Sequence, residues 1–167
     1  MHNTQTSGHK EYGDFASGGS GNDIIVGHTN DESLFGGPGH DYLFGFNGDD
    51  HLDGGEGDDF ILALFGDDKM IGGPGDDQIY VEYGTNDLDG GDGDDYMRGG
   101  DGDDDIKGGD GDDDINGRYG NDEVDGGLGD DIVRGGGIEK TYGTDVVRGG
   151  PGNDLVYGGH TQEFTGG

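Results

Sequence analysis

The sequence lacks cysteine and tryptophan, and it is poor in basic and apolar residues. Its 167 residues include 8 lysines and arginines against 39 aspartates and glutamates, which gives a net charge of −31, and 26% of the residues are hydrophobic. Without cysteine the chain has neither disulfides nor thiolate metal sites. Nucleic acids and anionic membrane surfaces carry the same sign of charge as the chain, so we expect neither as a partner.

Long apolar segments are also absent from the beginning of the chain. The first 15 residues, MHNTQTSGHKEYGDF, contain no apolar run, so the sequence predicts neither a secretory signal peptide nor a transmembrane segment here. Low hydrophobicity combined with high net charge is typical of disordered chains. Composition alone therefore predicts disorder for a chain whose carboxylates have no counter-ion.

Glycine and aspartate, which are abundant, recur with a period of nine residues. Thirteen blocks, beginning with GGSGNDIIV at 18–26, follow each other without a gap, and two more extend the repeat to residue 157. The fourteenth block contains an insertion, IEKTY, at 138–142. Position 6 is aspartate in thirteen of the fifteen blocks, and position 8 is apolar in all fifteen. This regularity predicts a repeat fold over 18–157, flanked by an N-terminal segment or cap at 1–17 and a degenerate C-terminal repeat or cap at 158–167.

The repeat predicts an all-β fold. Positions 1 to 6, GGxGxD, have the composition of a turn, and positions 7 to 9 suit a three-residue strand whose middle side chain points inward. One apolar row per strand is enough for two short parallel sheets that face each other, with two blocks in each turn of the chain. Fifteen blocks then make about seven and a half turns, roughly 36 Å long at about 4.8 Å per strand.

Stacking of the turns brings position 6 of each block next to position 6 of the block two further on. Aspartates would lie about 4.8 Å apart there, with turn carbonyls between them. Cages of carboxylate and carbonyl oxygens bind hard cations, and flexible geometry with many oxygens favours Ca²⁺ over Mg²⁺. Because one thin apolar row is a weak core and stacked aspartates repel each other, we expect calcium to control folding.

The block pattern GGxGxDxUx, where U is a large apolar residue, resembles the RTX, or hemolysin-type calcium-binding, nonapeptide repeat. The resemblance covers 18–157 and implies a parallel β-roll, a right-handed β-solenoid with two repeats per turn, which binds several Ca²⁺ ions between successive turns. It also implies export by type I secretion and an extracellular or cell-surface location. The ligands that it implies are position-6 aspartates and the carbonyls of the GGxGxD turns, which gives Asp23, Asp41, Asp59, Asp77, Asp95, Asp113, Asp131 and Asp154 on one edge, Asp50, Asp68, Asp104, Asp122 and Asp145 on the other, and Gly18, Gly36, Gly54, Gly72, Gly90, Gly108 and Gly126.

Odd-numbered and even-numbered blocks lie on opposite edges of such a roll. Every block of the odd edge begins with paired glycines, and its eight turns leave seven gaps for ions. The even edge has seven turns and six gaps, and its second position holds residues such as Phe46, Leu64 and Arg118 instead of glycine. Glu32 and Asn86 also replace aspartate on this edge. We therefore expect several weak or empty even-edge sites and a total of roughly 8–12 ions.

The outward positions of the strands in odd-numbered blocks predict an apolar face. It comprises Ile24, Val26, Tyr42, Phe44, Phe60, Leu62 and Tyr80. Soluble monomers seldom leave such a face uncovered. Three interpretations remain open: the N-terminal segment covers the face, the face mediates self-association or contact with a larger-protein partner, or its aromatic rings bind a sugar.

No motif of an enzyme accompanies the repeat. The chain has no GxSxG elbow and no pair of histidines at metal-binding spacing, and acid–base catalysis needs two carboxylates in contrasting environments rather than many in equivalent ones. The sequence therefore predicts a non-enzymatic, calcium-gated structural or secretion-associated domain. The alternative is a polysaccharide- or glycan-binding module that uses the aromatic outer face.

Overall fold

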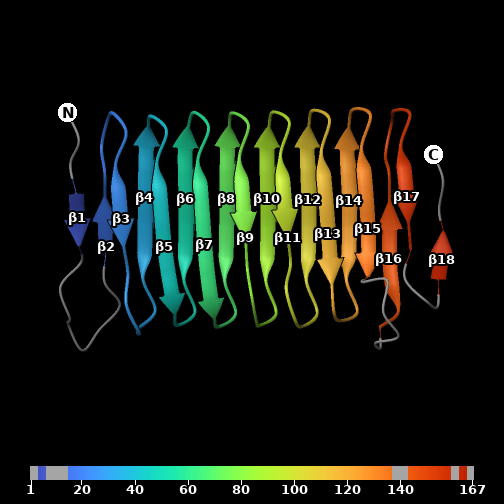
Figure 1. Ribbon diagram of the computed structural model, residues 1–167, viewed down its shortest axis with the longest axis horizontal. Coiled ribbons are helices and arrows are strands. Elements are labelled where there is room, and N and C mark those ends of the chain that lie inside the picture. Colours follow the sequence, from blue (N-terminus) through green and yellow to red (C-terminus); the bar gives the residue numbers. More distant parts are fainter. Residues whose placement is uncertain (1–3, 7–14, 137–142, 159–161, 165–167) are drawn as a thin grey trace.

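The computed structural model describes residues 4–6, 15–136, 143–158 and 162–164, and within these ranges the structure is all-β. Its strands form two nine-stranded parallel sheets, and the chain alternates between them (Figure 1). Odd-numbered strands make one sheet, here called the odd sheet, and even-numbered strands make the other, the even sheet. These stacked coils confirm the predicted parallel β-roll. Over the same ranges, no helix has the length and apolar character needed to cross a membrane.

The strands of each sheet follow one another in chain order. The odd sheet contains β1 (Thr4–Thr6), β3 (Ile24–Val26), β5 (Tyr42–Asn47), β7 (Phe60–Phe65), β9 (Gln78–Tyr80), β11 (Tyr96–Arg98), β13 (Asp114–Arg118), β15 (Ile132–Gly136) and β17 (Leu155–Tyr157). The even sheet contains β2 (Phe15–Ser17), β4 (Ser33–Pro38), β6 (His51–Glu56), β8 (Lys69–Pro74), β10 (Asp87–Asp92), β12 (Asp105–Asp110), β14 (Glu123–Leu128), β16 (Asp145–Arg148) and β18 (Gln162–Phe164).

Many strands are longer than the three residues that the repeat predicts. Strands such as β4, β6 and β8 have six residues, because they continue through positions 1 to 3 of the next block. Gly37, at position 2, pairs in register with Gly55 one turn away. A methyl group on Gly55 would overlap the carbonyl of Gly37, so glycine permits this close approach of the two backbones. Only positions 4 to 6 then remain as the turn between the sheets.

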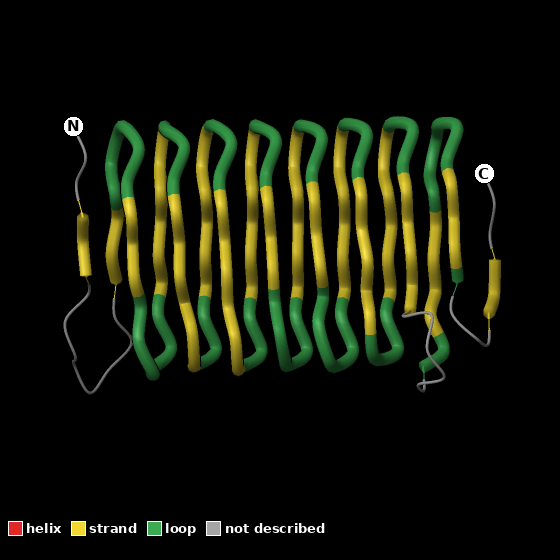
Figure 2. The backbone as a smooth tube through the Cα atoms, viewed as in Figure 1, coloured by secondary structure: helices red, strands yellow, loops and turns green. Residues whose placement is uncertain are grey.

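The register between strands confirms two blocks per turn. Leu34 pairs with Leu52 and Leu88 pairs with Ile106, each partner lying 18 residues further along the chain. The roll has two edges: at the odd edge an even-numbered strand leads to the next odd-numbered one, and at the even edge the reverse connection is made. Figure 2 shows the same alternation of strand and loop from one turn to the next.

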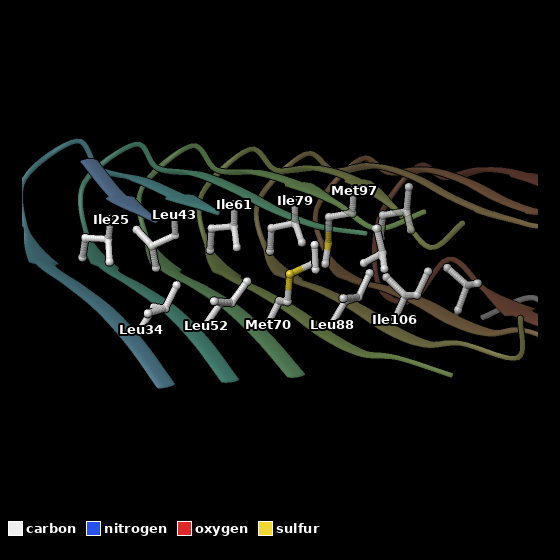
Figure 3. Close-up of a cluster of buried hydrophobic side chains, with 14 of the residues drawn as sticks. Ile25, Leu34, Leu43, Leu52, Ile61, Met70, Ile79, Leu88, Met97 and Ile106 are labelled. Carbon is white, nitrogen blue, oxygen red and sulfur yellow. The ribbon is translucent and has the colours of Figure 1, made fainter. Parts of the chain in front are cut away.

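The core is a double row of position-8 side chains, one row from each sheet. Ile25, Leu43 and Ile61 of the odd sheet face Leu34 and Leu52 of the even sheet, and all five side chains are fully buried (Figure 3). The rows continue through Met70, Ile79, Leu88, Met97, Ile106, Ile115, Val124, Val133 and Val147, with the half-buried Val156 packed against them. Among the described residues, Ala63 and Val81 at position 1 also belong to this core, and the rest of the interior beside the rows is made of backbone and position-6 side chains.

The described parts of the segments 1–17 and 158–167 extend the sheets. β1 pairs with β3 at the end of the odd sheet, and β2 pairs with β4 in the even sheet, where Ala16 lengthens the buried row. β18 pairs with β16 at the other end. Strands β1 and β2 therefore lie within the layers of the roll and do not cover the apolar face. The insertion 138–142 lies outside the described residues.

Candidate metal centre

Each turn directs its position-6 side chain into the roll. Positions 6, 8 and 1 alternate with outward positions 7 and 9, so the residue two before each core side chain is also inward and buried. Asp154, in the last turn, is half-buried. The buried position-6 residues, each 1–4% exposed, are Asp23, Glu32, Asp41, Asp50, Asp59, Asp68, Asp77, Asn86, Asp95, Asp104, Asp113, Asp122, Asp131 and Asp145. The structure therefore brings all thirteen predicted aspartates into two rows, one along each edge.

A ladder of hydrogen bonds connects the members of each row. The main-chain amide of Asp41 donates to Oδ1 of Asp59 over 2.7 Å, and the amide of Asp59 donates to Oδ1 of Asp77 over 2.7 Å. The same bond recurs at all seven gaps of the odd edge. It also recurs at the six gaps of the even edge, where Glu32 and Asn86 take part. The ladder uses Oδ1 of the accepting carboxylates and leaves the second oxygen of most of them without a donor, whereas Glu32, the first residue of the even row, accepts the amides of His28 and Asn30 in its own turn.

The second oxygen, Oδ2, is buried and receives no hydrogen bond from the protein on most of these carboxylates. This holds for Asp41, Asp50, Asp59, Asp68, Asp77, Asp95, Asp104, Asp113, Asp122 and Asp131. A buried carboxylate oxygen without a donor is costly, since it has lost its water and gained no partner. Both edges therefore contain a row of buried carboxylate oxygens that, among the described residues, have neither a hydrogen-bond donor nor a positive charge beside them.

A backbone carbonyl of the next turn lies beside most of these oxygens. A methyl group added to Gly72 would overlap Oδ2 of Asp77 and lie 2.6 Å from the carbonyl oxygen of Gly90. Gly36, Gly54, Gly90, Gly108 and Gly126 have the same two oxygens as neighbours, from the aspartate of their own turn and the glycine of the next. Because these first-position residues have no side chain, a space lined by oxygen atoms of two turns remains beside them. Such a donor set fits a hard cation.

Burial also changes the protonation of these groups. Loss of water raises the pKa of Asp77 and of Asp104 to about 8, from an ordinary value of 3.8. Burial likewise raises the pKa of Asp59 and of Asp95 to about 7. Amide hydrogen bonds from the neighbouring turn lower these pKa values but do not cancel the desolvation, and nearby carboxylates raise them further. Without a cation, the carboxylates of Asp59, Asp77, Asp95 and Asp104 are therefore held poorly in their charged form at neutral pH.

Side chains alone do not complete a coordination sphere. In the part of the chain that the structure describes, no group of three or more His, Cys, Asp and Glu side chains is placed to hold a metal ion. Each gap has position-6 carboxylates from only two turns, such as Asp77 and Asp95. An ion bound in such a gap would need further oxygens from backbone carbonyls, which the glycine-rich turns bring close.

A second ladder, which the repeat pattern did not predict, runs along the outside of both edges. At position 5, Oδ1 of Asp94 accepts the amide of Asp112 over 2.9 Å, and Oδ1 of Asp112 accepts the amide of Asp130 over 2.8 Å. These bonds run in the opposite direction to the inner ladder and are exposed. Position 5 is aspartate or asparagine in twelve of the fifteen blocks. That preference was the available signal for the outer ladder.

A β-solenoid whose turns are lined by oxygen atoms and contain buried carboxylates without a counter-ion belongs to the class of metal-binding repeat proteins. The family model for the RTX calcium-binding nonapeptide repeat matches residues 11–43, 26–61, 44–79, 80–115, 107–137 and 141–160. The chain belongs to this family, whose repeats bind Ca²⁺. No curated protein matches the chain.

Proposed function

We propose that the chain is a calcium-gated structural module, which is unfolded without calcium and folds as Ca²⁺ binds between its turns. The observation that carries this proposal is the row of buried Oδ2 atoms without a donor, on carboxylates such as Asp59, Asp77 and Asp95. Burying such charges opposes folding unless a counter-ion joins them. The narrow core, two rows of apolar side chains, contributes little stabilisation to offset that cost.

Position-6 aspartates and turn carbonyls, including those of the first-position glycines, are the proposed ligands. Ca²⁺ accepts six to eight oxygens in flexible geometry, whereas Mg²⁺ requires a tight octahedron and keeps its waters, so the backbone-rich turns suit Ca²⁺. We expect roughly 8–12 ions, more of them on the odd edge. At ten times the dissociation constant each ion adds about 1.4 kcal/mol, so ten add about 14 kcal/mol, comparable to the net stability of a whole domain.

A titration monitored by far-ultraviolet circular dichroism tests this proposal. The chain is first depleted of calcium with a chelator, and Ca²⁺ is then added, with Mg²⁺ as the matched control. We expect a cooperative change from coil to β structure with Ca²⁺ only. A chain that is folded without calcium, or that responds equally to both ions, would contradict the proposal.

An extracellular or cell-surface location accompanies this function. RTX repeats typically occur in secreted proteins. We propose that type I secretion exports the chain unfolded from a calcium-poor cytosol and that folding follows outside. Fractionation of cells that express the tagged chain together with a type I exporter tests the route. Retention of the chain in the cytosol would contradict it.

The apolar face supports a role in contact with another protein. On the odd sheet Phe60 packs against Tyr42 and Tyr80, with ring centroids 5.8 and 5.4 Å apart, and Tyr80 continues to Tyr96 at 5.7 Å. Tyr42 remains 51% exposed. We propose that this face binds a second copy or a larger protein. Sedimentation in calcium tests self-association: the mass should rise with concentration, and Phe60→Gln should prevent the rise. A wild-type chain that stays monomeric would contradict self-association.

Glycan binding is the second candidate, and the exposed rings of Tyr42 and Tyr96 at the ends of this aromatic row favour it. The inner rings of Phe60 and Tyr80 are half-buried between their neighbours and offer less surface to a sugar. Joint substitution of Tyr42 and Tyr96 together with Phe44, Phe60 and Tyr80 should leave calcium-driven folding intact under both candidates. Only glycan binding predicts that retention on a polysaccharide column is lost, so unchanged retention would reject it.

A further inference from the structure

The even-edge turn 81–86, between β9 and β10 in Figure 1, departs from the repeat at the positions that surround the proposed ions. It has Val81 at position 1, Glu82 at position 2 and Asn86 at position 6. We infer that the gap between Asn86 and Asp104 holds no calcium ion, and that an amide group and an apolar side chain replace the ion there. This inference rests on the proposed calcium binding and specifies where it does not occur.

The Asn86 side chain supplies donors where the other turns have only acceptors. Its Nδ2 group donates to Oδ1 of Asp104 over 2.8 Å, and its main-chain amide donates to the same atom over 3.0 Å. Its Oδ1 accepts the amide of Asp68 over 2.9 Å, so the inner ladder continues without interruption. An N–H group thus stands where aspartate would place its second oxygen. That group neutralises part of the Asp104 charge and would repel a cation.

Val81 fills the space that the first-position glycine leaves in other turns, in addition to the loss of charge at Asn86. In the next turn, a methyl group on Gly99 would overlap Oδ2 of Asp104, which shows that this oxygen lies over the first-position glycine. At Val81 that place contains a real side chain, which is only 1% exposed. Carbon atoms therefore occupy the volume that oxygen atoms line in the glycine turns. The gap therefore lacks both one charged ligand and the space for an ion.

Backbone and side-chain contacts hold this turn in the stack without an ion. Tyr83 forms parallel bridges to Phe65 on one side and Asp101 on the other. The Phe65 and Tyr83 rings stack with centroids 4.8 Å apart and planes 5° from parallel. The amide of Asp101 also donates to the carbonyl of Glu82 over 2.8 Å. The even edge is therefore continuous in structure, while its calcium sites fall into two separate sets.

Counting bound ions after restoration of the repeat tests the inference. Equilibrium dialysis against saturating calcium, followed by elemental analysis, gives the number of ions per chain. The double variant Val81→Gly/Asn86→Asp should bind one more ion than the wild type. Thr85→Asp is the matched control, because it adds the same charge to the outer position 5 of the same turn. It should leave the number unchanged, with circular dichroism confirming that both variants fold.

The outcomes separate this inference from the proposed function. A wild-type chain that folds with calcium, together with a restored variant that binds no additional ion, would overturn the inference alone. An equal gain in Thr85→Asp would also overturn it, because added charge rather than a restored site would then explain the binding. A wild-type chain that binds no calcium would overturn the proposed function and the inference with it.

Discussion

The main-chain amide of Asp77 donates a 2.7 Å hydrogen bond to Oδ1 of Asp95 one turn further along the odd edge, while Oδ2 of Asp95 is buried without a donor. The two oxygens of one carboxylate thus have different tasks. Oδ1 fixes the distance between turns through the backbone, and Oδ2 is the proposed ligand of a cation. Charge and hydrogen bonding can therefore be separated by a substitution that keeps the shape of the side chain.

Asp95→Asn is that substitution. Asparagine keeps an acceptor for the Asp77 amide but removes the charge, so we expect the calcium-bound roll to lose about 1–3 kcal/mol, the contribution of one bound ion. Denaturant unfolding in saturating calcium measures this loss. Asp94→Asn, the neighbouring position-5 residue in the exposed outer ladder, is the matched control and should change stability by less than about 0.5 kcal/mol. Equal losses of unfolding free energy in the two variants would show that the buried charge of Asp95 makes no special contribution to the stability of the calcium-bound roll.

Gly72→Ala tests the oxygen-lined space directly. The added methyl group would overlap Oδ2 of Asp77 and crowd the carbonyl of Gly90, so the turn must widen. We expect a loss of about 1–3 kcal/mol and a higher calcium concentration at the folding midpoint. A calcium titration followed by circular dichroism gives that midpoint. Ser20→Ala, at an exposed turn position, should leave it unchanged. A Gly72→Ala midpoint equal to that of the wild type would contradict the proposed location of the ions.

The periodicity makes the two rows of buried side chains predictable from the sequence alone. An aspartate two residues before each apolar side chain must share its face, because side chains alternate along a strand. Strand length was not predictable in this way. Positions 1 to 3 read as turn because they are glycine-rich, yet Gly37 and Gly55 pair as strand residues. Glycine carries no side-chain signal to distinguish a turn from a closely stacked backbone.

The exceptions to the repeat show what sequence alone left open. Asn86 departs visibly from the repeat, but the hydrogen bond of its Nδ2 group to Asp104 depends on a side-chain orientation that the repeat pattern does not determine. The ring stack of Phe65 and Tyr83 likewise depends on the conformation of the even-edge turns. The apolar face was predictable, since its residues occupy outward positions. Its mutual ring packing was not, because ring orientation depends on contacts between neighbouring turns.

Leu88→Ala tests how far the thin core supports the roll. Leu88 is fully buried in a narrow core, so we expect the cavity to cost about 2–5 kcal/mol in the calcium-bound state. The calcium midpoint should rise as well, because folding and binding are coupled. Leu128→Ala is the matched control, since Leu128 is 51% exposed at the end of β14. Leu88→Ala unfolding at the same denaturant concentration as the wild type would indicate that bound ions dominate stability.

Acid should partly replace calcium. Burial raises the pKa of Asp77 to about 8 and that of Asp59 to about 7, against 3.8 for an ordinary aspartate, so the folded roll binds more protons than the unfolded chain between about pH 4 and pH 8. Stability of the calcium-free roll is then greatest below this window and is lost as pH rises through it. Circular dichroism in chelator should show more β structure at about pH 5 than at about pH 8. Equal β content at the two pH values would mean that the folded roll does not bury carboxylates with raised pKa values.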